Sequence, residues 1–116
     1  MQRSFRLTRS EDFKRVRRYG RSFAHPLVTL VTQASDEPGL RVGIVAGRTL
    51  GSAVKRNRAK RLLREAMRTF LPSLAAGWDL LLIARPPLVA SDLFEVREAL
   101  LTLLRRAELV LPADAI

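Results

Sequence analysis

The residues best suited to bind a charged partner are the cations of the stretch Arg48–Arg68. Its sequence is RTLGSAVKRNRAKRLLREAMR, with eight Lys or Arg residues and a single acid, Glu65. An arginine side chain can bind a phosphate group through two parallel hydrogen bonds, and an asparagine amide can hydrogen-bond a base edge or a sugar. These residue types, gathered in one short stretch, indicate binding to the backbone of a nucleic acid.

The spacing of this stretch predicts an amphipathic helix from Ser52 to Phe70. At about 100° per residue, one arc of that helix is apolar. It consists of Ala59, Leu62, Leu63, Ala66, Met67 and Phe70. The opposite arc carries Asn57 and the cations Arg56, Lys60, Arg61, Arg64 and Arg68. Ser52 can cap the helix, and Pro72 stops it. Like charges four residues apart repel, so this arc fits a polyanionic partner better than a face that only meets solvent.

No other group of residues predicts a catalytic or metal site in the polypeptide. The chain has no Cys, which excludes thiolate ligands and fits a cytoplasmic protein. The one His, His25, is expected at a strand edge. The acids Asp92, Glu95 and Glu98 are expected on the solvated face of a helix. In the loop Gly47–Ser52 the glycines are four apart and no Lys-Ser/Thr pair follows, so we expect a turn and not a P-loop. The polypeptide therefore lacks the groups of a self-sufficient nuclease.

The length and charge of the chain fit one RNA-binding domain over residues 1–116, with a basic arm at 1–7 and a frayed tail at 112–116. The formal net charge is +10 for 116 residues. Residues 1–25 hold eight Lys or Arg and residues 48–68 another eight, whereas from Thr69 onward four Arg stand against six acids. Such a field attracts nucleic acid. No apolar run reaches the ~20 residues of a membrane span, so we expect no membrane partner.

Hydrophobic periodicity and turn residues predict two further helices and three strands. The first helix runs from Thr8 or Ser10 to Tyr19 and is closed by Gly20, and the last runs from a cap at Ser91 or Asp92 to about Glu108. Strands are expected over residues 27–33, over 40–46 antiparallel to the first, and over the apolar 80–84 at a central position. The order helix-strand-strand-helix-strand-helix predicts an α/β (α+β) two-layer sandwich of one small mixed sheet and covering helices.

The segment Val54–Glu65, with the sequence VKRNRAKRLLRE, resembles the signature of the bacterial ribonuclease P protein subunit. The family shows an Arg-Asn-Arg core, then Lys-Arg, then Arg-Glu after two apolar positions. The resemblance extends over nearly the whole chain. It includes Leu7, Asp12-Phe13, Val16 and Gly20, then Arg41–Val45 with Gly51–Val54, and finally Trp78-Asp79 and Ile83–Arg85.

This resemblance implies a fold like domain 2 of ribosomal protein S5, with a left-handed βαβ crossover where the general preference is right-handed. It implies a protein subunit of ribonuclease P that binds the catalytic RNA and the 5′ leader of precursor tRNA. The metal-dependent removal of the leader would then use catalytic groups and Mg²⁺ held mainly by the RNA, and the protein alone would be inactive, with no small-molecule substrate. The residues also leave open a non-catalytic RNA-binding module, such as a ribosomal or assembly protein, and a stand-alone nuclease.

The resemblance also assigns candidate binding residues. Those for the catalytic RNA are Arg48, Lys55, Arg56, Asn57, Arg58, Lys60, Arg61, Arg64 and Arg68. Those for the leader, in a cleft between the first helix and the sheet, are Phe13, Arg17 and Val31. Arg17 and Val31 replace aromatics that are common in the family, and Arg48-Thr49 replaces a Lys-Lys pair. An aromatic among cations suits unpaired bases, but whether Phe13 lies in the cleft or in the core stays open.

Overall fold

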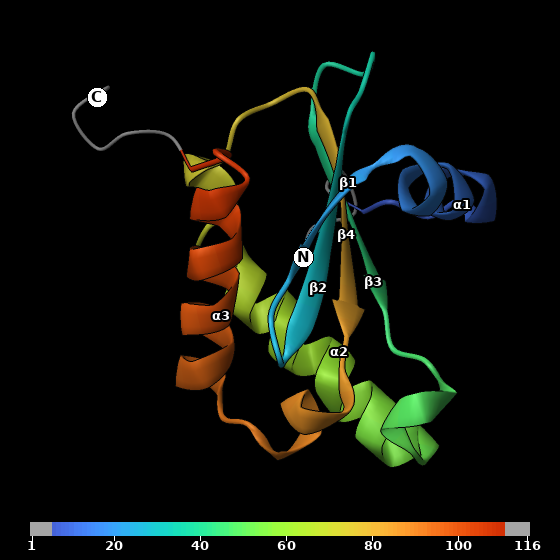
Figure 1. The fold of residues 1–116 in the computed structure, drawn as a ribbon, viewed down its shortest axis with the longest axis vertical. Coiled ribbons are helices and arrows are strands. Elements are labelled where there is room, and N and C mark those ends of the chain that lie inside the picture. The colour runs from blue at the N-terminus through green and yellow to red at the C-terminus, as the bar shows by residue number, and fades with distance from the viewer. Residues whose placement is uncertain (1–5, 111–116) are drawn as a thin grey trace.

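Four strands form one mixed sheet in the computed structural model, which describes residues 6–110, and helices pack on both faces of it (Figure 1). The helices are α1 (Ser10–Tyr19), α2 (Ala53–Arg68) and α3 (Leu93–Arg106). The strands are β1 (Arg21–Ala24), β2 (Val28–Ala34), β3 (Leu40–Val45) and β4 (Trp78–Ala84). Short 3₁₀ turns cover Arg48–Leu50, Leu71–Ser73 and Pro86–Ala90. The strand order is β1-β2-β4-β3, with β4 antiparallel to β2 and parallel to β3.

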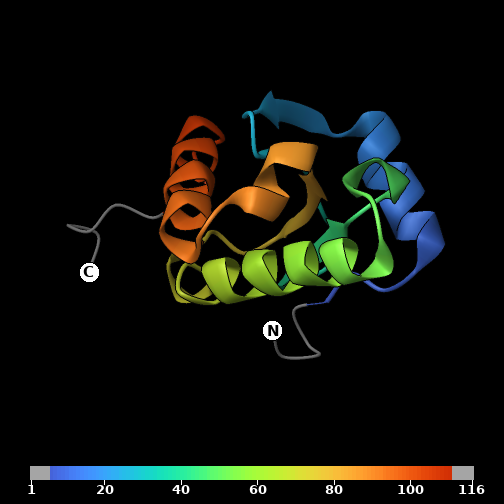
Figure 2. The same ribbon diagram turned by 90° about the horizontal axis from the view of Figure 1, so that it is seen from below.

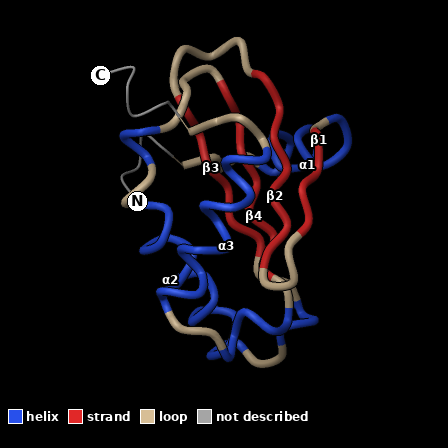
Figure 3. The backbone as a smooth tube through the Cα atoms, turned by 60° about the vertical axis from the view of Figure 1, so that its left-hand side comes forward, coloured by secondary structure: helices blue, strands red, loops and turns tan. Residues whose placement is uncertain are grey.

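The structure confirms the three predicted helices and the central position of the apolar strand β4 (Figure 3). It differs in the neighbours of the other strands. β2 and β3 run in opposite directions, as expected, but β4 lies between them and they do not pair. The strand β1 was not predicted, because only Phe23 of its four residues is buried and the segment lacks an apolar alternation. The β3–α2–β4 segment forms the expected crossover between parallel strands.

Helices cover both faces of the sheet, which adds a layer to the expected two-layer sandwich (Figure 2). Successive residues of a strand point to opposite faces. Accordingly, Leu30, Leu80 and Leu82 join the large core beneath α2 and α3, whereas Val31 and Leu81 join a smaller cluster with Leu7 and Val16 beneath α1. The sequence pattern did not show this, because β4 is apolar on both faces. The cationic helix α2 and the aromatic-bearing helix α1 therefore belong to opposite layers.

Local capping fixes where α2 and α3 begin. The hydroxyl of Ser52 accepts a hydrogen bond from the backbone N–H of Lys55 at 3.3 Å, as the sequence predicted. At α3, Asp92 and Glu95 form a reciprocal capping box, in which each side chain accepts from the backbone N–H of the other. Such caps typically contribute about 1 kcal/mol each. The loop before α2 is anchored by Leu50, which is buried in the large core.

Two glycines let α1 lie close to the sheet. A Cβ atom on Gly43 of β3 would come within 2.8 Å of the Phe13 ring, so the ring lies directly against the backbone of that strand. A Cβ atom on Gly20, which follows α1, would come within 2.4 Å of the Val16 carbonyl oxygen and 2.6 Å of the Val31 side chain. Both contacts are closer than any side chain tolerates, so larger residues would push α1 away from the sheet.

The predicted basic arm is attached to the sheet where the structure describes it. The backbone N–H of Leu7 donates to the carbonyl of Val42 at 2.9 Å, and Arg6 forms a parallel bridge with the same residue. Leu7 is buried beside α1, so residues 6 and 7 follow the edge of β3. The rest of the arm and the predicted tail at 112–116 lie outside the described residues.

A buried carboxylate joins α1 to the sheet. Asp79, at the start of β4, is fully buried. Arg41 of β3 donates to both of its oxygens at 2.9 Å, and Arg15 of α1 donates to one of them at 2.5 Å. Arg15 also bonds Gln33 of β2 and pairs with Asp12 at 3.1 Å. Burial alone would raise the pKa of Asp79, but the hydrogen bonds from Arg41 and Arg15, together with their charges, hold this pKa below its usual range.

We predict that Asp79→Asn lowers the unfolding free energy at pH 7 by about 3 kcal/mol, because breaking a buried ion pair leaves the remaining charges unmatched. Because the pKa of Asp79 is lower in the folded state, its ionised form stabilises the protein at pH values above the unfolded-state pKa of about 3.9. This stabilisation is lost as the pH falls through the folded-state pKa. The difference between the two proteins should therefore shrink below about pH 4. Urea unfolding across pH 7 to 3 measures it.

Asp36→Asn is the matched control, because Asp36 is exposed in the turn between β2 and β3. It should change the unfolding free energy by less than about 0.5 kcal/mol. An Asp79→Asn protein as stable as the Asp36→Asn protein at pH 7 would show that the buried network contributes nothing to folding.

Candidate nucleic-acid interface

The apolar arc of α2 packs on the sheet, which directs the cationic arc outward. Ala59, Leu63 and Ala66 are fully buried, together with Met67, while Leu62 and Phe70 are half-buried. The outward side chains are Lys55, Arg56, Asn57, Lys60, Arg61, Arg64 and Arg68, all exposed or partly exposed. Arg48, in the turn that precedes α2, is also exposed. All nine predicted RNA-binding side chains are thus exposed or partly exposed.

One of these nine, Arg58, is exposed but is hydrogen-bonded to another part of the protein. Its Nε donates to the carbonyl of Val89 at 3.0 Å, and one terminal nitrogen donates to the carbonyl of Ser91 at 3.3 Å. These carbonyls belong to the 3₁₀ turn and the loop that lead into α3. Arg58 therefore fastens the start of α3 to α2. The sequence could not show this, because the two carbonyls lie more than thirty residues away along the chain.

Part of the cationic charge is neutralised by an acid on the same helix. Arg68 pairs with Glu65 at 2.9 Å, an i,i+3 contact in which both side chains are largely exposed. Exposed pairs of this kind stabilise a helix by about 0.5 kcal/mol or less. In the described part of the chain, the other cations of α2 form no ion pair. Their charges are available to a polyanion.

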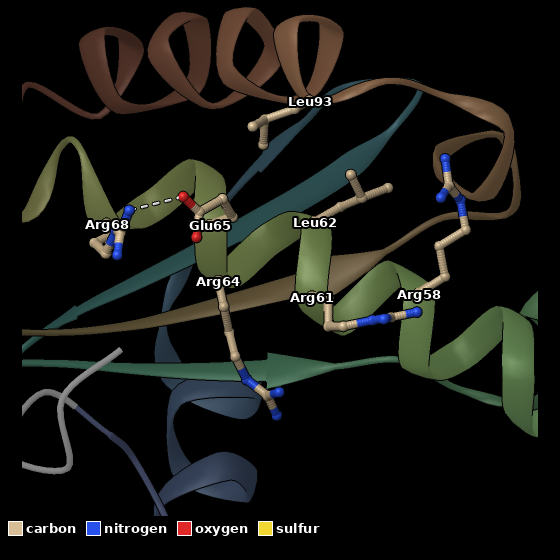
Figure 4. Close-up of a pocket in the computed structure, with 7 residues that line it drawn as sticks. All are labelled: Arg58, Arg61, Leu62, Arg64, Glu65, Arg68 and Leu93. Atoms are coloured by element: carbon tan, nitrogen blue, oxygen red, sulfur yellow. Dashed lines mark hydrogen bonds and ion pairs between the residues drawn. The ribbon is translucent and has the colours of Figure 1, made fainter.

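A groove of about 550 Å³ runs between α2 and α3 (Figure 4). Leu62 of α2 and Leu93 of α3 both line it, and Arg58 and Arg61 lie at one end. The Glu65–Arg68 pair closes the other end. Arg64 extends from α2 away from α3, toward the side on which α1 lies. The basic helix thus offers cations to both of its flanks.

A second hollow, of about 230 Å³, lies where α1, α2 and the edge of β3 meet. It is lined by Arg6, Leu7, Thr8, Phe13, Val42, Ile44, Lys60 and Arg64. Phe13 is half-buried, since its ring rests on Gly43 and also faces this hollow. Phe13 therefore belongs both to the apolar cluster beneath α1 and to an accessible surface. The contribution of residues 6–8 was missed in the sequence, although an apolar Leu7 within a basic arm was a sign that this arm is attached.

The other two predicted cleft residues lie apart from this hollow. Arg17 is exposed in the last turn of α1, where its charge is accessible. Val31 is 2% exposed and is covered by Gly20 and the apolar side of α1. A valine at this position supports α1 from below and presents almost no surface to a ligand.

The described residues, 6 to 110, contain no group of three or more His, Cys, Asp or Glu side chains that could hold a metal ion. None of the helices in that range is both long and apolar enough to cross a membrane. The chemistry that the two hollows beside α2 offer is the binding of anions by guanidinium and ammonium groups, with the Phe13 ring accessible in the smaller one.

The fold is α+β, with a cationic helix on one layer and an aromatic ring among cations on another. A model of the family "Ribonuclease P" matches residues 1–108. The ribonuclease P protein component of Chloroflexus aggregans is 45% identical over 108 residues, which covers 92% of this chain and 80% of that protein. The corresponding protein of Herpetosiphon aurantiacus is 40% identical over 109 residues, which covers 94% of this chain and 89% of that protein.

Solved structures agree with this comparison. The ribonuclease P protein of Staphylococcus aureus superimposes with a TM-score of 0.82 at 27% identity, over 91% of this chain and 97% of that one. The protein of Thermotoga maritima gives a TM-score of 0.77 at 32% identity, over 87% of this chain and 96% of that one. The chain belongs to the ribonuclease P protein family. It is a subunit of ribonuclease P, an endoribonuclease of tRNA processing whose catalysis is metal-dependent, and its partner is an RNA.

We predict that Arg58→Gln destabilises the fold by about 1–2 kcal/mol, because two carbonyl oxygens lose a charged hydrogen-bond donor. Arg61→Gln is the matched control: it removes the same charge from the same helix, and Arg61 is exposed. It should change the unfolding free energy by no more than about 0.5 kcal/mol. Urea unfolding of both variants measures the difference, and equal stabilities would contradict the fastening role of Arg58.

Proposed function

We propose that the chain binds the catalytic RNA of ribonuclease P through the exposed cations of α2. We further propose that it holds the 5′ leader of precursor tRNA along α1, beginning at the hollow lined by Phe13. One observation carries this proposal: Lys60 and Arg64 belong to the cationic face of α2 and also line the hollow that contains the Phe13 ring. A strand that enters the hollow can therefore stack a base on Phe13 while its phosphates meet cations of the RNA-binding helix.

The two surfaces suit different forms of RNA. The face of α2 carries cations and Asn57 without an aromatic, which fits structured RNA recognised mainly through its backbone. α1 carries Phe13 with Lys14 and Arg17 nearby, which fits an unpaired strand whose bases stack. The β3 edge and residues 6–8 lie between the two helices. The protein would thus place the leader next to the catalytic RNA at a fixed distance and orientation.

The chemical step is assigned to the RNA partner in this proposal. Divalent ions such as Mg²⁺ would supply the activated water and stabilise the developing charge. The part of this chain that the structure describes offers no ligand cluster for them. What the protein contributes is positive charge, which lowers the repulsion between two polyanions and so strengthens the binding of substrate and of metal ions to the complex. Precursor tRNA as substrate implies a cytoplasmic location.

Cleavage of a precursor tRNA with and without the cognate catalytic RNA tests the proposal. The protein alone should release no leader, and it should improve cleavage by the RNA at low Mg²⁺. Arg56→Gln combined with Arg61→Gln should weaken assembly with the catalytic RNA by roughly 10- to 100-fold near 0.1 M salt, the effect of two lost phosphate contacts. Assembly is measured as protein–RNA affinity.

Arg105→Gln serves as the control, because Arg105 is exposed on α3, outside the α2 face, and carries the same charge. Its affinity for the catalytic RNA should stay close to that of the unmodified protein. Accurate leader removal by RNA-free protein would overturn the assignment of the chemistry to the RNA. Unchanged assembly of the Arg56/Arg61 variant would overturn the role of α2.

The leader site makes a separate prediction. Phe13→Ala should weaken binding of a long-leader substrate to the assembled enzyme by about 1–3 kcal/mol, the effect of one lost base stack. It should have little effect on a substrate with a one-nucleotide leader and on assembly. Phe13→Leu keeps most of the apolar contact with Gly43, so it shows whether any loss arises from stacking or from a displaced α1.

Phe94→Ala is the matched control, since Phe94 is 68% exposed on α3 and lies outside the hollow. It should bind long- and short-leader substrates as the unmodified protein does. If Phe13→Ala weakened both substrates equally, Phe13 would act through folding and the leader would lie elsewhere.

A further inference from the structure

We propose that the outer edge of β1 is a third RNA-binding surface, separate from α2 and from the α1 hollow, and that it takes phosphate groups of an RNA backbone. Its cations are Arg21, Arg85 and Arg106, with His25 beside them, and we call these four residues the β1 edge strip. β1 and α2 lie on opposite sides of the molecule (Figure 2). The inference rests on the proposed function only in that it also assigns the chain an RNA partner.

Arg21 and Arg106 are both ordered on one aromatic ring. The guanidinium carbon of Arg21 lies 5.1 Å from the centroid of the Phe23 ring, and that of Arg106 lies 6.0 Å from it. A terminal nitrogen of Arg106 also donates to the carbonyl of Ala24 at 3.1 Å. Cation–π contacts of this kind keep the charge and most of the N–H donors available. The two guanidinium groups are thus held in place before any ligand binds.

The strip continues beyond Ala24 into a hollow of about 380 Å³, which Ala24, His25 and Arg85 line with two prolines. The Nδ1 atom of His25 accepts a hydrogen bond from the backbone N–H of Leu27 at 3.1 Å. In the neutral ring the proton is then on Nε2, which leaves that atom as a donor. The hollow therefore offers an imidazole N–H and a guanidinium, which are the groups that bind a phosphate.

The balance of charge favours a polyanion over solvent. Arg21, Arg85 and Arg106 are exposed, and within residues 6–110 none of them pairs with an acid. A charged residue on an edge strand also prevents pairing with another chain. On a strand of four residues, one cation suffices to prevent such pairing. Edge protection therefore does not account for a hollow with two further donors. A run of preordered cations next to open donors is typical of a surface that contacts RNA phosphates.

The test compares the salt dependence of RNA binding in full-length variants. The probes are the cognate catalytic RNA and a precursor tRNA with a long leader, each titrated between roughly 0.1 and 0.4 M KCl. Arg21→Gln and Arg85→Gln should each reduce the slope of log K against log salt by roughly 0.7–0.9 for the RNA that the strip contacts, and the double variant by about twice that. The two probes show which RNA that is. Arg105→Gln, which removes one exposed charge from the neighbouring α3, should leave both slopes unchanged.

Two outcomes would overturn the inference while the proposed function stands. In the first, the unmodified protein binds RNA normally, and the double variant gives the same slopes of log K against log salt as the unmodified protein. The other is self-association of the double variant, seen by light scattering, with unchanged RNA affinity, which would assign the strip to edge protection. If the unmodified protein bound neither RNA, the proposed function and this inference would both fail. Circular dichroism of each variant confirms that the fold is intact before titration.

Discussion

The buried carboxylate of Asp79 is the interaction on which the arrangement of the surfaces depends. A fully buried carboxylate is costly unless charged donors compensate it, and here the donors come from two other elements, Arg15 of α1 and Arg41 of β3. The ion network therefore fixes α1 on the face of the sheet opposite α2 and α3. Phe13, near the start of α1, rests on Gly43 because of that attachment. The position of the aromatic ring relative to the cationic helix is set by the buried charges.

The arginines of α2 serve two purposes: some make contacts within the protein, and others keep their charge exposed. Arg58 and Arg68 use their guanidinium groups within the protein, to hold the start of α3 and to pair with Glu65. Among residues 6–110, the side chains of Arg61 and Arg64 make no such contact, so their charges are available to a polyanion. The like charges along α2 would weaken an isolated helix. The helix forms because its opposite side is buried in the core, where apolar contacts outweigh the repulsion.

Much of the fold followed from local signals in the sequence. The periodicity of α2 and α3, the cap at Ser52 and the apolar run of β4 act within one or two turns of chain, so the residues alone reveal them. The same holds for the charge distribution that indicated RNA, and for the Arg-Asn-Arg motif that is typical of the family. For α3 the sequence left Ser91 or Asp92 as the cap, and the structure shows a capping box at Asp92. The strand β1 escaped notice because its stability comes from pairing with β2 and from one buried ring.

The sequence by itself determined the helices, the central strand, the cationic face and the family. Only the tertiary structure decided which cations make contacts within the protein. A guanidinium group can bind a carboxylate, a carbonyl, an aromatic ring or solvent, and which of these it binds depends on what lies nearby in space. Arg58 meets carbonyls 31 and 33 positions away, and Arg106 meets Ala24 across 82 positions. The exposure of Phe13 and Val31 was also decided by the tertiary structure. Both residues lie on the side of the sheet that α1 covers. The packing of that helix leaves the phenylalanine half-accessible and closes over the valine.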